Sequence, residues 1–338
     1  MDNIFRPIVC QIIQNSGASQ KDVILLLSTC KILKNARKYY MKNNCFLWMD
    51  EQTYLKNKDS VKRLILRGPV RNKIDLRNLI YFKSAYFNQP VNDFGNMHTF
   101  FCQRFNQPIE NFGRLKVFHC FSFNQPVNNF GNLLDFCCQM FNQPVANFAR
   151  LKSFNCDFFN QPVNDFGSLN FFQCQFFDHP IKDFGALKHF QCQCFNQNVE
   201  NFGNLKHFEC NLFDKKIKNF GNLTNFECTN FNQYVSDFGN LKVFHSTYFN
   251  EPIANFGALK YFICNSFNRR IENFDNLEHF QSFCFNQPVK DFGNLTHFLC
   301  GQFKHRVYEF GKLINFKCHA SNASGNDFIK FFFSNHLL

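Results

Sequence analysis

A Phe-Asn pair recurs along this chain at an interval of eighteen residues, without any insertion. The phenylalanine of the pair first stands at Phe87, and its register continues to Phe303, which makes thirteen repeats. A fixed period of this length is typical of a solenoid, in which each repeat forms one coil and packs only on its neighbours. This repeat constrains the fold more than any other feature of the sequence.

One repeat reads L-x-x-F-x-C-x-x-F-N-Q-P-V-x-[DN]-F-G-N, and we number its positions from 1 at the leucine. Eighteen residues are too few for two helices and a turn, because helical repeats need about 33 residues or more. Proline at position 12 and glycine at position 17 interrupt any long helix. Phe at position 4 and Cys at position 6 alternate with variable residues, which predicts a short strand. We therefore expect a mainly β protein, a parallel β-solenoid of thirteen Phe-rich repeats.

The repeat pattern divides the chain into four parts. We expect a small helical domain at 1–50, a connector and capping coil at 51–78, the repeat solenoid at 79–320 and a C-terminal cap at 321–338. Apolar spacing from Ile4 to Ile13 supports a helix in the first part. Caps are expected because a coil cannot bury its apolar faces alone, and an end coil lacks one neighbour.

Composition excludes several classes of protein. With 52 Phe in 338 residues, the chain has enough apolar surface to fold, which excludes disorder. No apolar run of about 18 residues is present and no signal peptide is visible, so we expect no membrane span. The net charge of +12 is concentrated in residues 1–80, which hold fifteen Lys or Arg against six Asp or Glu. The many cysteines favour reducing conditions, so we expect a cytoplasmic protein.

Two polar rows follow from the repeat. Cysteine occupies position 6 in eleven coils, and serine replaces it at Ser84, Ser246 and Ser282. We interpret this row as small buried side chains beside Phe, because stacked coils about 4.8 Å apart separate the Cβ atoms too far for disulfides. A thiolate row that binds a soft metal is the alternative, but the C-x-x-C spacing of zinc sites is absent. Asn at position 10 is predicted to bond the backbone of its own and adjacent coils, and Asp or Asn at position 15 to cap a turn.

Catalysis finds no support in the sequence. No phosphate loop, nucleophile triad or paired-carboxylate pattern stands out, so we expect a non-enzymatic protein with no catalytic, cofactor or metal site. Positions 3, 5 and 7 are expected to point outward and to vary, which suits recognition of a partner protein; a merely solvated face is the alternative. The candidate target-binding residues are Phe101, Gln103, His119, Phe121, Asn155, Asp157, Phe171, Gln173, Gln175, Glu209, Glu227 and His245.

The Phe-Asn-Gln-Pro repeats of residues 79–320 resemble FNIP repeats, which are related to leucine-rich repeats but are usually longer. The N-terminal segment resembles a divergent F-box. The residues that carry this second resemblance are Ile4, Pro7, Ile8 and Ile12 in the opening helix, Lys21-Asp22-Val23 in the centre, then Cys30-Lys31 and Trp48. Proteins that combine the two features occur in amoebae and in the large viruses that infect them.

This resemblance implies a substrate adaptor of a cullin-type ubiquitin ligase. The helical head would bind a Skp-type adaptor and the solenoid an unknown target protein, in the host cytosol if the protein is viral. The residues implied for adaptor contact are Ile4, Pro7, Ile8, Ile12, Leu26, Leu27 and Cys30. Two alternatives stay open. One is a solenoid that binds protein partners without a ubiquitin role. The other is nucleic-acid binding through the basic N-terminal segment, against which the small net charge of the repeats speaks.

Overall fold

The protein is a parallel β-solenoid of about 15 turns, as the eighteen-residue repeat predicts. The computed structural model describes residues 46–274 and 276–318. The chain divides into two compact units: unit 1 comprises Met1–Val163 and Gly167–Cys174, and unit 2 comprises Asn164–Phe166 and Gln175–Leu338. The division falls inside the predicted solenoid at 79–320, because a repeat protein has neighbour contacts but no single central core.

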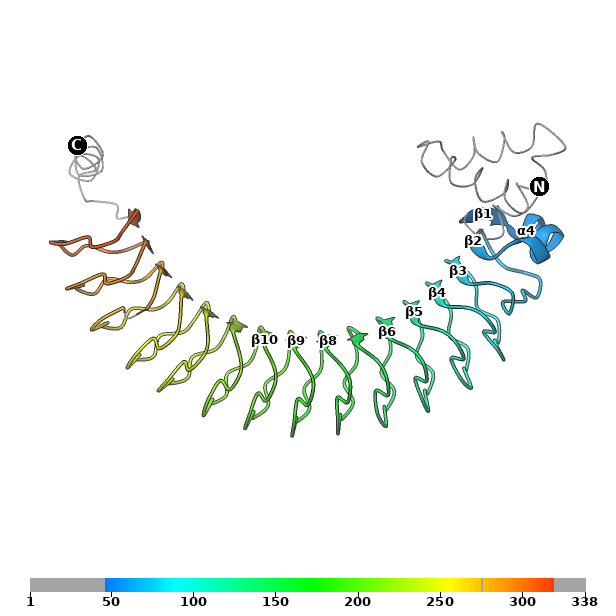
Figure 1. The fold of residues 1–338 in the computed structure, drawn as a ribbon, viewed down its shortest axis with the longest axis horizontal. Coiled ribbons are helices and arrows are strands. Elements are labelled where there is room, and N and C mark those ends of the chain that lie inside the picture. Colours follow the sequence, from blue (N-terminus) through cyan, green and yellow to red (C-terminus); the bar gives the residue numbers. More distant parts are fainter. Residues whose placement is uncertain (1–45, 275, 319–338) are drawn as a thin grey trace, which may run out of the picture. The chain divides into compact units, whose positions relative to one another are not determined.

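The described residues of unit 1 form eight strands, each paired in parallel with the next (Figure 1). They are β1 (Leu47–Asp50), β2 (Arg63–Arg67), β3 (Tyr81–Ser84), β4 (Thr99–Cys102), β5 (Val117–Cys120), β6 (Asp135–Cys138), β7 (Ser153–Asn155) and β8 (Phe171–Cys174). From β2 onward, partners lie one repeat apart, as in Phe82 with Phe100 and Phe100 with Phe118. The register therefore stacks identical repeat positions on one another.

The described part of unit 2 repeats this arrangement with eight further strands. They are β9 (His189–Cys192), β10 (His207–Cys210), β11 (Asn225–Cys228), β12 (Val243–His245), β13 (Tyr261–Ile263), β14 (His279–Ser282), β15 (His297–Cys300) and β16 (Asn315–Cys318). Each is again parallel to the next, in the same register of one repeat.

The sheet of unit 1 begins earlier than the sequence indicated. Strand β1 pairs Leu47 with Leu64, so residues 47–50 belong to the sheet and not to a helical domain at 1–50. The offset here is seventeen residues and the Phe-Asn motif is missing, which is why the repeat pattern did not reveal this strand. The predicted helices of the first part, and the predicted cap at 321–338, lie outside the described residues.

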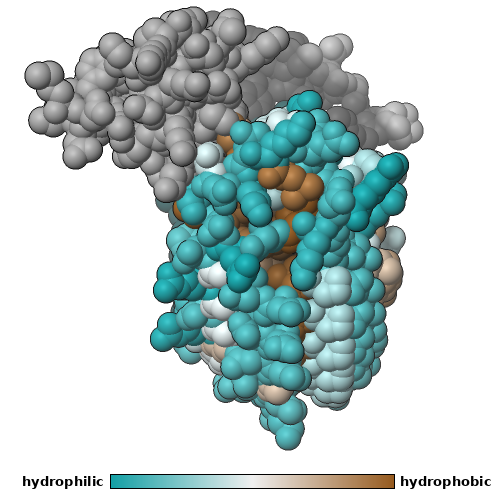
Figure 2. Space-filling model, turned by 90° about the vertical axis from the view of Figure 1, so that its right-hand side faces the viewer, coloured by the Kyte–Doolittle hydropathy of each residue, from teal (hydrophilic) through white to brown (hydrophobic). Residues whose placement is uncertain are grey.

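Helix α4 (Glu51–Asn57) and the short 3₁₀ helix η1 (Lys58–Ser60) connect β1 to β2. Asp50 caps α4, since its side chain accepts a hydrogen bond of 2.7 Å from the Thr53 amide. The buried Glu51 carboxylate accepts the Arg71 amide at 2.8 Å, and the Tyr54 hydroxyl donates to the Asp75 carbonyl at 2.9 Å. These bonds fasten the helix to the first coil. Figure 2 views this end of unit 1 and shows apolar atoms in a narrow strip bordered by hydrophilic ones.

Three columns of phenylalanine, at positions 4, 9 and 16, form the interior of every complete repeat. In unit 1 the rings of Phe100 and Phe118 stack at 5.3 Å, and those of Phe105 and Phe123 stack at 6.0 Å. Rings of different columns meet edge to face, as Phe118 and Phe123 do at 5.1 Å. Both arrangements match the quadrupole preference of aromatic pairs. Unit 2 has the same columns, for example Phe208 stacked on Phe226 at 5.5 Å.

Asparagine at position 10 forms the predicted ladder between coils. The Asn106 amide donates to Asn88 Oδ1 at 2.9 Å, and the Asn124 amide donates to Asn106 Oδ1 at 2.8 Å. These side chains are exposed or half-buried and not fully buried. Asp178 substitutes for Asn because the site needs only an acceptor, which its Oδ1 supplies to the Asn196 amide at 2.8 Å. At position 15 the turn capping is confirmed, as Asp93 Oδ1 accepts the Gly95 amide at 2.7 Å.

The cysteine row does more than fill space. The Cys120 thiol donates to the Phe105 carbonyl of the preceding coil at 3.0 Å, and Cys210 donates likewise to Phe195 at 3.0 Å. Ser246 makes the equivalent bond to the Phe231 carbonyl at 2.9 Å. Position 6 therefore selects a small side chain that carries a donor, which explains why serine and not alanine replaces cysteine. The cysteines of the described residues are free thiols.

Substitutions at position 17 test the backbone conformation of the turn directly. Glycines there have a positive φ, such as 57° at Gly131, and Ala149 occupies the same position with φ 48°. An L-residue with this φ costs about 1–2 kcal/mol of folding free energy. Glycine avoids this strain, but part of the gain is offset because glycine loses more conformational entropy on folding. We expect Ala149→Gly to raise the free energy of unfolding by about 0.5–1 kcal/mol and Gly131→Ala to lower it by about 1 kcal/mol. Urea unfolding of both variants measures this, and a destabilised Ala149→Gly variant would contradict it.

Candidate interaction surface

The variable residues of the repeat lie on one continuous surface of each unit, which we call the outer strand surface. It consists of positions 3 and 5 on the strands and positions 7 and 8 in the turn that follows. The burial pattern of β5 shows the alternation, with Phe118 and Cys120 buried and Val117 and His119 half-buried. Because identical positions stack in register, outward side chains form columns that differ only in residue type.

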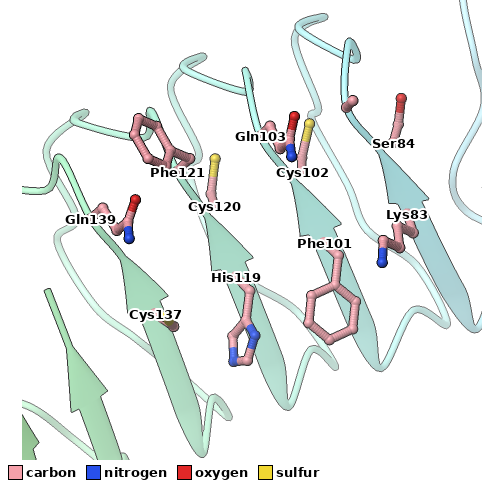
Figure 3. A pocket seen from close by; sticks show the side chains of 11 residues that line it. Lys83, Ser84, Phe101, Cys102, Gln103, His119, Cys120, Phe121, Cys137 and Gln139 are labelled. Atoms are coloured by element: carbon pink, nitrogen blue, oxygen red, sulfur yellow. The ribbon is translucent and has the colours of Figure 1, made fainter. Parts of the chain in front are cut away.

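In unit 1 this surface contains a hollow of about 310 Å³, which we call the aromatic hollow. It is lined by Lys83, Ser84, Ala85, Phe101, Cys102, Gln103, His119, Cys120, Phe121, Cys137 and Gln139. Figure 3 shows the rings of Phe101 and His119 projecting side by side from neighbouring strands, β4 and β5. Phe121 stands in the turn after β5 and is 53% exposed.

Ring contacts hold the wall of the aromatic hollow in place. The Phe101 ring meets His119 edge to face at 4.8 Å and Tyr81 at 5.6 Å. His119 Nε2 lies 2.7 Å from Asp135 Oδ2, so these two groups satisfy each other. Burial raises the pKa of the Cys137 thiol, with a smaller contribution from the Asp135 charge. The hollow thus has an aromatic wall held by ring contacts, and it includes a thiol, Cys137, whose burial disfavours ionisation.

Cations pack over aromatic rings beside the aromatic hollow. The guanidinium of Arg104 lies 4.9 Å from the Tyr86 ring centre, and that of Arg67 lies 4.5 Å from the ring of Trp48. Such contacts hold a charge in place without neutralising it. This part of the surface therefore offers ordered positive charge next to exposed apolar area.

In unit 2 the outer strand surface has an acidic hollow of about 180 Å³, lined by Glu209, Asn211, Glu227, Cys228, Thr229, His245 and Thr247. Glu209 Oε1 accepts a hydrogen bond of 3.0 Å from Gln191 Nε2. The two glutamates are register partners on β10 and β11, and Glu227 is in turn the partner of His245 on β12. Like charges in such close positions favour a cationic group of a partner.

Two histidine stacks lie on position 3 of unit 2. His189 and His207 stack at 4.4 Å, and His279 and His297 at 4.2 Å. Burial lowers the pKa of His189, and the neighbouring His207 lowers it further. The pKa of His279 is lowered in the same way by burial and by His297. Acidification therefore charges His189 and His279 less readily than an isolated histidine.

The structure places the twelve predicted target-binding residues on or beside this surface. Phe101, Gln103, His119 and Phe121 line the aromatic hollow, and Glu209, Glu227 and His245 line the acidic one. The remaining five are half-buried, at Asn155, Asp157, Phe171, Gln173 and Gln175. Asn155 Nδ2 donates to Gln173 Oε1 at 2.9 Å, so part of this group bonds internally.

Position 8 was missed by the sequence analysis. Large apolar side chains there are 41–57% exposed, at Tyr86, Met140 and Phe158 in unit 1 and at Phe176, Leu212 and Tyr248 in unit 2. Strand alternation does not extend into the turn, so it gave no prediction for this position. A comparison across coils would have found it, since apolar residues recur there outside the three phenylalanine columns.

The implied adaptor-binding residues, from Ile4 to Cys30, lie outside the described residues. Within residues 46–274 and 276–318, no group of His, Cys, Asp and Glu side chains is arranged to hold a metal ion. In the same segments, no helix has both the length and the apolar character needed to cross a bilayer. The chain matches no protein-family model, no curated protein and no solved structure. The FNIP and F-box resemblance remains a prediction from sequence.

Proposed function

We propose that this protein is an interaction scaffold that binds a target protein through its outer strand surface. The observation that carries the proposal is the contrast between the two sides of each strand. Positions 4 and 6 keep Phe and Cys or Ser in every repeat, whereas positions 3, 5, 7 and 8 change from coil to coil and expose large apolar side chains. Clustered exposed apolar residues with a polar border are typical of protein interaction sites.

We further propose that the N-terminal segment links this scaffold to a Skp-type adaptor and a cullin ubiquitin ligase. The support is the F-box-like pattern of residues 4–31, which the described residues do not test. In this arrangement the solenoid selects the target and the head delivers it to the ligase. The two activities reside in separate segments, so they are expected to be separable by mutation.

The test uses the full chain and two double variants. Leu26→Asp with Leu27→Asp should abolish binding to a purified Skp-type adaptor and leave target capture from host lysate unchanged. Met140→Ser with Phe158→Ser removes two exposed apolar side chains of unit 1 and should reduce target capture at least about tenfold while adaptor binding persists. Circular dichroism checks that both variants remain folded.

Each half of the proposal can fail separately. Unchanged adaptor binding by the Leu26 and Leu27 double variant would refute the ubiquitin-ligase role. Unchanged target capture by the Met140 and Phe158 double variant would refute target recognition through this surface of unit 1.

A further inference from the structure

We propose that the aromatic hollow of unit 1 binds an acidic protein segment that carries an aromatic or large aliphatic side chain. This inference rests on the proposed function and specifies the partner chemistry at the same surface. It follows from the shape of the hollow, its charge and its unused hydrogen-bonding groups.

The shape suits a side chain and not a whole small molecule. The volume of about 310 Å³ is at the lower end of the range of about 300–1,000 Å³ for ligand pockets. Phe101, His119 and Phe121 provide ring edges and faces that a further aromatic ring can contact in the preferred offset or edge-on geometry. One anchoring side chain of an extended segment would fill this space.

The charge at the aromatic hollow is positive, and it has no ion-pair partner within the described residues. Lys83 is exposed, and its ammonium group makes no ion pair or hydrogen bond within the described residues, although it lines the hollow. The lining contains no Asp or Glu. Asp135, on the adjoining strand, is already held by His119 at 2.7 Å. Arg104, over Tyr86 at 4.9 Å, adds a second cation that has no carboxylate partner in the described part of the chain. A carboxylate next to the anchoring side chain would satisfy these cations.

The hydrogen-bonding groups suit a peptide backbone. Gln103 and Gln139 occupy position 7 on either side of Phe121 and line the hollow (Figure 3). Their side-chain amides make no hydrogen bond with other described residues. An amide both donates and accepts, so each can pair with a peptide N–H and C=O of a segment lying across the coils.

The same features disfavour single-stranded nucleic acid. Base stacking needs open ring faces. Arg67 covers one face of Trp48 and Arg104 covers one face of Tyr86, so each of these rings has at most one open face for a base. The hollow itself holds one lysine, which matches one carboxylate better than a row of phosphates.

The experiment selects binders from a displayed library of random twelve-residue peptides against the full chain. Recovered peptides should carry Asp or Glu within two or three residues of Phe, Trp, Tyr or Leu. Lys83→Glu should weaken the binding of a selected synthetic peptide at least about fivefold, because it replaces an attraction by a repulsion. Phe101→Ala should weaken this binding about tenfold. Arg150→Glu, an exposed charge change in the turn before β7 and outside the lining, is the matched control and should have no effect.

Selected peptides without an acidic residue, or with affinity unchanged by Lys83→Glu, would overturn the inference. So would recovery of no binding peptide, or tighter Lys83-dependent binding of a twenty-nucleotide poly(U) or poly(dT) probe than of any peptide. The proposed scaffold role is judged separately, by target capture with the Met140 and Phe158 double variant. If the peptide selection fails while the unmodified chain still captures its target and the Met140 and Phe158 double variant does not, only the inference about the aromatic hollow is refuted.

Discussion

Truncating Phe136 to alanine is expected to lower the free energy of unfolding by about 3–5 kcal/mol. The ring is fully buried and lies between its stacked neighbours Phe118 and Phe154, at 5.7 and 5.6 Å. It also meets Phe130 and Phe141 edge to face, each at 5.0 Å. Removal loses the transfer free energy of the ring and leaves a cavity that the rigid backbone of the adjacent coils cannot close.

The matched control is Phe158→Ala, which removes the same ring from a site that is 45% exposed. Its expected cost is below about 1 kcal/mol, because little surface is returned to water. Urea unfolding monitored by circular dichroism, with hydrogen exchange to locate the change, compares the two variants. Equal losses for both would contradict the assignment of the phenylalanine columns as the source of stability.

The loss of protection from hydrogen exchange should also be confined to the coils next to Phe136. Each coil is stabilised by its neighbours, so the weakest coil sets where unfolding begins. In Phe136→Ala, amides of β5, β6 and β7 should exchange faster, while those near β2 keep their protection. A uniform increase over unit 1 would show that its coils unfold as one cooperative block instead.

The sequence could predict the fold because its period, its three phenylalanine columns and its turn residues all agree. An eighteen-residue repeat without insertions leaves one register, and the pairing of Phe118 with Phe100 and Phe136 follows that register. The first strand could not be predicted in the same way. Leu47 pairs with Leu64 at a different offset and with aliphatic residues in place of Phe. Its place in the sheet depends on packing with β2 and not on a motif.

The candidate surface was only partly accessible from sequence. Strand alternation indicated that Phe101 and His119 point outward, and they line the aromatic hollow. It could not indicate that His119 bonds Asp135, since this contact joins positions 5 and 3 of different coils. It also could not predict the exposed row at position 8, such as Phe158, which depends on the path of the turn.

The cysteine row shows how a chemical role can hide behind a plausible packing role. Size alone explains a small residue at position 6, but it does not explain the choice of serine as the substitute. The hydrogen bond from Ser282 Oγ to the Phe267 carbonyl at 2.8 Å reproduces that of Cys264 to Phe249 at 2.9 Å. Burial raises the pKa of thiols such as Cys264 to about 12 and so keeps them in their protonated, donating form. This has a consequence for the stability of the protein in alkali.

The stability of the protein is expected to fall steeply above pH 9. Burial raises the pKa of Cys120, Cys192, Cys228 and Cys264 from 9.0 to about 12. These thiols are therefore neutral in the folded protein while the same thiols ionise in the unfolded chain. A folded pKa above the unfolded one gives stability that is complete below about pH 9 and is lost progressively up to about pH 12.

The size of this loss in unfolding free energy follows from the linkage between proton binding and folding. Each of these thiols should remove about 1 kcal/mol of unfolding free energy between pH 9 and 10, so the four together remove about 4 kcal/mol. Urea unfolding at pH 8, 9 and 10 measures the loss. The variant with all four changed to Ser keeps the donor to the carbonyl, as Ser246 does at 2.9 Å, and has no thiol to ionise. We expect its loss between pH 9 and 10 to be smaller than that of the unmodified protein by about 4 kcal/mol.

Cys194→Ser provides the control for this comparison, because Cys194 is a half-buried thiol at position 8 and lies outside the inner row. It controls for the effect of a Cys-to-Ser change outside the inner row. If the fourfold variant and the unmodified protein lose stability equally between pH 9 and 10, these four thiols do not supply the alkaline sensitivity. A difference confined to the fourfold variant would identify the cysteine row as a set of protonated donors that the solenoid requires to remain folded.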